Sequence, residues 1–434
     1  MYSTDTRTLQ PGDTYVAIRG ERFDGHDFVP QAVAGGAAAV VVERDVDVPE
    51  GVEVVRVESA LDHLTSLAHQ KMAESGAAVV GITGSVGKTT TKNAAIAVLR
   101  ERFEVVAAEG NLNTPLGLAL TVLNRTFAAD SVAVLEMGAR IPGDIAELCR
   151  LFPPTVSVVT AVQGVHLETL GSLEGVAREK GAIVRALGPE GTAVLNADDA
   201  RVRAMADGLA ARVLLYGAAP DADVGPDIVT ATLPLLGEHA LSTALAAAAV
   251  GRALGLDDAA INRGLAQIQP EKGRLVRLPG RGGSTIIDDT YNASPGATRS
   301  ALGVLRDLDA TRHVALLGDM LELGADEVEQ HVVVLDAARE HADLVVAVGE
   351  IMGRAAELLN SAGPGGAVLT FATSTDLADA LRAGRPFAPG AGDAVLVKGS
   401  QGARMERVAA ALLDPDVDPA DVLARQSVSW QQTE

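Results

Sequence analysis

The stretch that decides the fold is Ala78-Val-Val-Gly-Ile-Thr-Gly-Ser-Val-Gly-Lys-Thr-Thr-Thr91, in which an apolar run passes directly into a glycine-rich turn. The run Ala78–Ile82 predicts a buried strand, and the residues from Lys88 to Leu99 favour a helix. Glycines let the backbone wrap closely around an anion, and a helix N-terminus offers unpaired N–H groups and the positive end of a dipole. We therefore predict a strand, turn and helix that bind phosphate groups.

The turn favours a nucleotide over a purely structural loop. Lys88 is placed to reach the β- and γ-phosphates, and the Thr89 hydroxyl to bind an accompanying magnesium ion. The strict phosphate-loop pattern has glycine where this chain has Ile82, so the alternative is an ordinary glycine-rich turn. Such a turn rarely places Lys-Thr at the start of the next helix, and we predict nucleotide binding. The candidate contacts are Gly84, Ser85, Gly87, Lys88, Thr89 and Thr90.

Outward from this motif, short apolar runs alternate with helical segments along the whole chain, which is typical of parallel sheets covered by helices. We predict an α/β protein of three domains: a small α/β domain at 1–76, a central parallel-sheet domain at 77–270, and a Rossmann-like domain at 271–434. A Pro-, Gly- and Arg-rich linker precedes the third domain. We expect the tail after Asp414 to be loosely held, with no role for Trp430.

The composition limits the kinds of partner and location that are compatible with this chain. The 36 Lys and Arg against 57 Asp and Glu give a net charge of −21, which argues against nucleic-acid partners and anionic membrane surfaces. The single cysteine, Cys149, lies on an apolar helical face and reads as a buried thiol without a disulfide. The apolar segment Ala240–Leu256 is mostly alanine and carries Arg252, so we predict a buried helix and no membrane span. The chain begins without an apolar signal segment, and a cytoplasmic location is expected.

Three further side chains are weak candidates when considered singly. Glu136 ends an apolar strand, where a magnesium ligand and an ordinary helix-initiating acid are equally good interpretations. His166 follows another strand and is by default a solvated loop histidine. Lys180 is by default a solvated helical lysine. Their occurrence together after a phosphate loop calls for a common explanation.

Motifs along nearly the whole chain supply that explanation, because they resemble those of the Mur ligase family. The central motifs are Gly81–Lys92, Gly110-Asn-Leu-Asn-Thr-Pro-Leu-Gly117, Leu135-Glu-Met-Gly-Ala-Arg140, His166-Leu-Glu168 and Glu179-Lys-Gly-Ala-Ile183. The N-terminal motifs, Thr4-Asp-Thr-Arg7 and Ala17–Phe28, resemble a UDP-binding domain. The last motifs, Asp288–Pro295, Leu317–Gly324 and Val397–Glu406, resemble the branch of the family that adds D-alanyl-D-alanine to a UDP-muramoyl tripeptide.

The resemblance implies an ATP-dependent, ADP-forming ligase of peptidoglycan synthesis, acting as a monomer on small molecules. It implies that Lys88, His166 and Lys180 are catalytic, with Lys180 carbamylated, and that two Mg²⁺ ions are bound by Thr89, Glu136, His166 and Lys180. It further assigns nucleotide contacts to Arg274 and Asp289. The substrate contacts that it implies are Thr6, Arg7, Asn111, Asn113, Asn292, Ser294 and Lys398.

Three departures keep alternatives open. Family members have a longer stretch before Thr4, so the UDP-binding domain is expected to be shortened. Ala240 and Thr243 replace two asparagines that help to hold adenine, and Ser294 replaces an asparagine on the amine side. A Mur-type ligase with a different amine or peptide substrate, and a catalytically impaired nucleotide-binding paralogue, are therefore the alternative interpretations.

Overall fold

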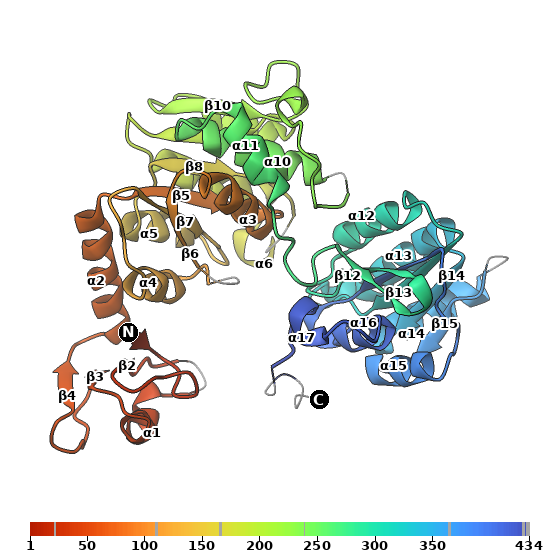
Figure 1. Ribbon diagram of the computed structural model, residues 1–434, viewed down its shortest axis with the longest axis horizontal. Coiled ribbons are helices and arrows are strands. Elements are labelled where there is room, and N and C mark those ends of the chain that lie inside the picture. The colour runs from red at the N-terminus through yellow and green to blue at the C-terminus, as the bar shows by residue number, and fades with distance from the viewer. Residues whose placement is uncertain are drawn as a thin grey trace. The chain divides into compact units, whose positions relative to one another are not determined.

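The computed structural model describes residues 1–20, 23–108, 112–164, 167–237, 239–362, 366–427 and 430. By compactness the chain divides into two units. The first contains Met1–Thr232 and Leu241–Ile268, and the second contains Leu233–Ala240 and Gln269–Glu434. Three sheets are distributed over these units, with two in the first unit and one in the second (Figure 1). The predicted bounds 1–76, 77–270 and 271–434 stay a prediction.

The first sheet is small and wholly parallel, in the order β1-β2-β3-β4. Its strands and helices are β1 (Tyr2–Ser3), β2 (Thr14–Val16), η1 (Gly25–Phe28), α1 (Val29–Ala34), β3 (Ala39–Val42), β4 (Glu53–Arg56) and α2 (Ala60–Ser75). Helix α2 begins where the Ser59 hydroxyl accepts a hydrogen bond from the backbone N–H of Asp62 (3.1 Å), and it ends at the left-handed Gly76.

The central sheet is also wholly parallel, in the order β10-β9-β8-β5-β7-β6. Its strands are β5 (Ala78–Thr83), β6 (Glu104–Ala107), β7 (Ser131–Glu136), β8 (Val156–Val159), β9 (Thr192–Asn196) and β10 (Arg212–Tyr216). The associated helices are α3 (Lys88–Leu99), α4 (Pro115–Leu123), α5 (Asp144–Leu151), α6 (Leu167–Leu170), α7 (Leu173–Lys180), α8 (Ala182–Arg185), α9 (Ala200–Arg203), η2 (Ala204–Ala206), η3 (Pro226–Ile228), α10 (His239–Ala253) and α11 (Asp258–Ala266).

Helix α2 ties the first sheet to the central one within the first unit. It packs along α4, and the Lys71 ammonium donates hydrogen bonds to the carbonyls of Leu123 (2.8 Å) and Arg125 (2.6 Å). At β1, Asn124 exchanges two hydrogen bonds with the Tyr2 backbone, at 2.7 and 2.8 Å. One continuous apolar core runs from Val16 and Leu64 in the first part to the central strands.

The third sheet has the order β11-β12-β16-β13-β14-β15, and only its β11–β12 pair is antiparallel. Helices α12, α13 and α14 cover one face, and α15 and α16 cover the other. The elements are β11 (Val276–Pro279), η4 (Arg281–Gly283), β12 (Thr285–Asp289), α12 (Pro295–Arg306), β13 (Arg312–Gly318), η5 (Gly324–Asp326), α13 (Glu327–His341), β14 (Leu344–Val348), α14 (Glu350–Ser361), β15 (Leu369–Phe371), α15 (Ser374–Arg382), β16 (Asp393–Lys398), η6 (Gln401–Ala403), α16 (Glu406–Leu412) and α17 (Pro419–Val422).

The fold class predicted from the sequence is confirmed, and so is the buried position of Cys149, which is 4% exposed. The expectation of a loosely held tail after Asp414 is wrong. Leu423 in that tail is 1% exposed within an apolar core, and the Trp430 ring lies 5.6 Å from the Arg404 guanidinium. The tail contributes a buried leucine to that core, which its overall polar composition did not suggest.

Glycine sets the spacing of two packed helices in the first unit. A Cβ at Gly264 in α11 would lie 2.5 Å from the Cα of Val98 in α3. We expect Gly264→Ala to lower the free energy of unfolding by about 1–3 kcal/mol, because the overpacking outweighs the better helix propensity of alanine. Urea unfolding measures the effect.

The matched control is Gly303→Ala in α12, where an added Cβ meets nothing within 4 Å. There the helix propensity acts alone and should raise the free energy of unfolding by up to about 1 kcal/mol. An unchanged or higher stability of Gly264→Ala would contradict the steric explanation.

Candidate active site

The glycine-rich turn leaves the carboxyl end of β5 and enters α3 through two residues with positive φ, Gly84 (149°) and Gly87 (79°). A Cβ on Gly84 would lie 1.9 Å from the Thr160 hydroxyl oxygen, so only glycine fits there. That hydroxyl donates a hydrogen bond to the carbonyl of Val86 (2.6 Å). The Ser85 N–H donates to the Ala161 carbonyl (2.8 Å). The turn is thus held against the end of β8.

Lys88 and Thr89 occupy the first two positions of α3. The Lys88 ammonium donates to the carbonyls of Gly84 (2.9 Å) and Ser85 (3.4 Å), so its charge lies over the turn. Thr89 is 6% exposed, and Thr90 is half-buried. The structure therefore brings together the six predicted phosphate-turn residues around one helix N-terminus, which is a favourable place for an anion.

Glu136 ends β7 beside this turn and is 2% exposed. Its Oε1 accepts a hydrogen bond from the Asn113 amide (3.0 Å), whereas its buried Oε2 has no hydrogen-bond partner. A buried carboxylate oxygen without a partner is costly and is suited to a cation. The contact between Asn113 and Glu136 was not predicted, since nothing in the local sequence relates residues 23 positions apart.

These groups fit a magnesium ion better than they fit a metal held entirely by protein. Within the ranges that the structure describes, no cluster of three or more His, Cys, Asp or Glu side chains is suited to hold a metal ion. Mg²⁺ typically uses one or two carboxylates together with substrate phosphates and waters. Glu136, with the Thr89 hydroxyl at the phosphate turn, supplies a donor set of that kind.

Lys180 ends α7 and is 2% exposed, so the default interpretation of a solvated lysine is wrong. Burial lowers the pKa of its ammonium to about 8, and the nearby positive charge of Lys88 acts in the same direction. The preceding Glu179 accepts backbone hydrogen bonds from Gly143 and Ile145, both at 2.8 Å. Glu179 thereby attaches the end of α7 to the start of α5.

Two predicted site residues, Asn111 and His166, lie outside the described residues. Thr6 and Arg7 lie in the turn after β1, and Arg7 is 75% exposed at its side chain. Arg7 pairs with the Asp5 carboxylate (Nη2–Oδ2 2.6 Å), and this hydrogen bond lowers the pKa of Asp5. The exposed guanidinium is accessible to a ligand.

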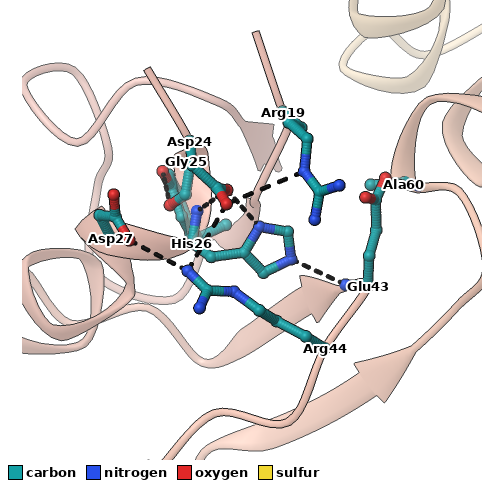
Figure 2. A network of polar contacts seen from close by, with 9 residues as sticks. Arg19, Asp24, Gly25, His26, Asp27, Glu43, Arg44 and Ala60 are labelled. Atoms are coloured by element: carbon teal, nitrogen blue, oxygen red, sulfur yellow. Dashed lines mark hydrogen bonds and ion pairs between the residues drawn. The ribbon is translucent and has the colours of Figure 1, made fainter.

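A buried histidine, His26, makes a network of polar contacts within the first sheet domain (Figure 2). The His26 ring has no exposed surface; its Nε2 accepts the Glu43 backbone N–H (2.8 Å), and its Nδ1 lies 2.5 Å from Asp24 Oδ1. Because Nε2 is an acceptor, the ring proton is on Nδ1 and is donated to Asp24. Glu43 in turn accepts the backbone N–H of Ala60 (2.9 Å), at the start of α2. His26 therefore links Asp24 to the backbone that follows β3, and the Glu43 side chain links that backbone to the start of α2.

In the second unit, the carboxyl ends of β12 and β16 bring together three predicted residues. The Lys398 ammonium is 2% exposed and donates to Asp289 Oδ2 (2.6 Å) and to the Asn292 carbonyl (2.9 Å). The Asn292 residue itself is exposed. Lys398 was expected to contact substrate, and in the structure its charge is engaged by protein groups.

The two remaining predicted residues of this unit are Arg274 and Ser294. The Arg274 guanidinium lies 4.2 Å from the centre of the Tyr291 ring. The Ser294 hydroxyl caps α12 by accepting the backbone N–H of Ala297 (3.4 Å). The hydroxyl that was expected to contact substrate thus also has a structural partner.

Comparison with known proteins extends the resemblance across the chain. Three family profiles match: "Mur ligase family, catalytic domain" over residues 1–78, "Mur ligase middle domain" over 82–251, and "Mur ligase, glutamate ligase domain" over 273–401. The UDP-N-acetylmuramoyl-tripeptide--D-alanyl-D-alanine ligase of Escherichia coli is 36% identical, over 94% of this chain and 93% of its own. The chain belongs to the Mur ligase family.

Other relatives of this Mur ligase agree. The Bacillus subtilis ligase of the same name is 33% identical over 95% of this chain and 93% of its own. The crystal structure of MurF from Acinetobacter baumannii has a TM-score of 0.82 at 30% identity and covers 94% and 92% of the two chains. That of MurF ligase from Thermotoga maritima, in complex with ADP, has a TM-score of 0.79 at 30% identity and covers 94% and 96%. Among the helices described, none has the length and apolar character needed to cross a membrane.

Asp288, next to the Asp289–Lys398 pair, has no exposed surface. Its Oδ1 accepts the Thr290 hydroxyl (2.7 Å), and its Oδ2 has no partner. Burial raises the pKa of Asp288 to about 6, so the folded state binds a proton more tightly than the unfolded state. The stability that this proton contributes is present below pH ~4 and is lost as the pH rises through about 6.

We therefore expect Asp288→Asn to gain stability relative to the wild type on going from pH 4 to pH 8, by up to about 3 kcal/mol. Thermal unfolding at both pH values measures the difference. The control is Asp309→Asn at an exposed position, which should show no such dependence. A pH-independent effect of Asp288→Asn would contradict the burial argument.

Proposed function

We propose that this protein joins D-alanyl-D-alanine to the carboxylate of UDP-N-acetylmuramoyl-tripeptide, forming ADP and phosphate, in peptidoglycan synthesis. The observation that carries the proposal is the 36% identity to a ligase of that name over 94% of this chain. The identity extends over the third sheet as well as the phosphate turn, and we assign the amine-side residues to that third sheet.

The chemistry must convert a poor acylating agent into a good one. A carboxylate oxygen attacks the γ-phosphorus of ATP, the bond to ADP breaks, and an acyl phosphate forms. The amine of the dipeptide then attacks the acyl carbon, loses a proton, and expels phosphate. Positioning and charge neutralisation supply most of the catalysis in such phosphoryl transfer.

The phosphate turn positions ATP in this scheme. We assign phosphate contacts to the backbone and side chains around α3, and neutralisation of the β/γ-phosphate charge to the Lys88 ammonium. Thr89 and Glu136 would hold a magnesium ion, with the unpartnered Glu136 Oε2 as the supporting observation. The ion supplies charge neutralisation at the phosphates. The remaining cofactor-binding residues in the assignment are Gly84, Ser85, Gly87, Thr90, Arg274 and Asp289.

In this proposal Lys180 would be a carbamate, and we assign it, together with His166, to a second magnesium ion. The neutral lysine amine reacts with CO₂ to give a carbamate anion and a proton. Burial favours this reaction because it lowers the pKa of Lys180 to about 8 and so increases the neutral fraction. The nearby Lys88 charge repels an ammonium at position 180 but attracts a carbamate. Modification would make the interaction with Lys88 attractive, whereas the nearby carboxylates of Glu179, Asp144 and Glu136 favour the ammonium form.

We assign the muramoyl peptide to Asn111 and Asn113, the UDP group to Thr6 and Arg7, and the incoming amine to Asn292 with Ser294 and Lys398. The exposed guanidinium of Arg7 and the exposed Asn292 support these assignments. We further propose that the protein acts as a monomer in the cytoplasm.

The first functional prediction is that sustained turnover of ATP to phosphate and ADP requires both UDP-muramoyl tripeptide and D-alanyl-D-alanine when no other nucleophile is added. Coupled ADP detection and mass spectrometry of the product measure it. Release of AMP and pyrophosphate would rule out the acyl-phosphate scheme. A panel of other amines tests whether Ser294 has changed the amine substrate, and absence of turnover with every amine would favour the impaired paralogue.

Lys180→Ala should lower ligation at least about a hundredfold, because it removes the carbamate, while ATP binding persists. Lys180→Arg should not restore activity, since a guanidinium does not react with CO₂. In the wild type, ¹³C-labelled CO₂ should give a carbamate NMR signal that both variants lack. The matched control is Arg178→Ala, an exposed position on the same helix, which should retain activity. Near-wild-type turnover of Lys180→Ala would eliminate the carbamate role.

A further inference from the structure

The C-terminal segment 414–427 is docked on the third sheet by contacts spread along its length. The Asp414 N–H donates to the Pro279 carbonyl (3.1 Å), and the Lys272 ammonium donates to the Ala420 carbonyl (2.8 Å). Leu423 is buried in the core formed with α15 and α16. This anchoring brings the next part of the segment, at Arg425, to the loop that follows β12.

Arg425 contacts that loop directly. Its side chain is 6% exposed and its backbone has a positive φ of 58°. One guanidinium nitrogen, Nη1, donates to the Thr290 carbonyl (3.0 Å) and pairs with Glu406 Oε2 (3.1 Å). The other, Nη2, donates to the Tyr291 carbonyl. The same guanidinium lies 5.4 Å from the centre of the Tyr291 ring.

The loop is held at each of its successive peptide groups. Arg425 binds the carbonyls of Thr290 and Tyr291, and Lys398 binds the carbonyl of Asn292 (2.9 Å). The Tyr291 N–H donates to the Gly273 carbonyl (2.9 Å). Backbone groups in the loop are thus engaged by protein, while Asn292 is exposed at its surface. A fixed backbone sets the position and direction from which that amide side chain leaves the loop.

Charge compensation does not account for Arg425. Its acidic partner, Glu406, is 1% exposed and is already paired through Oε1 with the Arg404 Nε (2.6 Å). Two carbonyls and a carboxylate are bound by the two terminal nitrogens of the forked guanidinium, whereas a lysine ammonium has only one nitrogen to place among them. Simultaneous hydrogen bonds to the Thr290 and Tyr291 carbonyls, one from each terminal nitrogen, are what the guanidinium adds to a simple ion pair.

We propose that Arg425 is a positioning residue for the amine substrate, acting through the Thr290–Asn292 backbone to orient Asn292. The inference rests on the proposed function, in which Asn292 binds the incoming amine. The C-terminal segment is then part of the ligation machinery, although it touches no reacting atom. Its effect should appear in the second half of the reaction and not in the formation of the acyl phosphate.

The experiment measures formation of the acyl phosphate separately from attack by the amine. With UDP-muramoyl tripeptide and ATP but no dipeptide, hydroxylamine traps the acyl phosphate as a hydroxamate and needs no amine site. Arg425→Gln should form hydroxamate at the wild-type rate, while its KM for D-alanyl-D-alanine rises about tenfold, as expected for loss of one or two orienting hydrogen bonds. Arg425→Lys, which keeps the charge but has a single nitrogen in place of the forked guanidinium, should have a KM between those of the wild type and Arg425→Gln.

Arg382→Gln in α15 is the matched control, because it removes an exposed arginine of the same unit whose side chain pairs with Asp379. It should leave every parameter unchanged. A wild-type KM for the dipeptide in Arg425→Gln would overturn the proposal. If Arg425→Gln and Arg425→Lys both lose hydroxamate formation, ATP affinity and thermal stability together, the proposal is overturned as well, since Arg425 would then be only structural. If the wild-type protein forms hydroxamate but does not ligate the dipeptide, the proposed function itself fails.

Discussion

The parallel register of the central sheet is the constraint on which the site depends. Ile82 pairs with Glu136 across β5 and β7, and Thr83 pairs with Val159 across β5 and β8. Since parallel strands end at the same edge, the phosphate turn, the Glu136 carboxylate and the Thr160 hydroxyl must leave the sheet together. A shift of one strand by a residue would turn Glu136 to the opposite face and push Thr160 out of contact with Gly84.

Around that edge, burial makes each charge depend on the others. Glu136 has an unpartnered oxygen, and Lys180 is a buried cation close to a second cation, Lys88. A buried carboxylate oxygen without a partner and two neighbouring cations each cost stability in the free protein, although the carboxylates of Glu179, Asp144 and Glu136 partly offset the Lys180 charge. In the proposed function, phosphates, a divalent cation and a carbamate would compensate these charges. The site is therefore organised for its ligands at some expense to the stability of the free protein.

Much of the fold was predictable, because continuous apolar runs such as Thr192–Asn196 and Leu344–Val348 have few alternatives to buried parallel strands. Strands of mixed character are harder to predict from the sequence. Glu53–Arg56 is largely exposed at a sheet edge, and Leu369–Phe371 is short and carries a polar residue. For such segments the neighbouring strand, and not the local pattern, decides the conformation.

The site residues that are close together in the sequence could be predicted. The contacts between residues far apart in the sequence could not. The phosphate turn from Gly84 to Thr90 is one contiguous motif. The pairing of Asn113 with Glu136, and of Lys398 with Asp289, joins separate strands and loops. Arg425 gave no signal, because an arginine in a polar tail has many ordinary explanations. Only the tertiary fold shows which backbone its guanidinium binds.

The docking of the tail has a practical consequence for spectroscopy. The chain contains one tryptophan, Trp430, and its ring lies beside the Arg404 guanidinium. The Arg404 Nη2 also donates to the Trp430 carbonyl (2.7 Å), which anchors the residue close to α16. Intrinsic indole fluorescence excited at the red edge therefore arises from this one place. The emission of the unlabelled protein is an optical reporter of whether its C-terminal segment is attached to the third sheet.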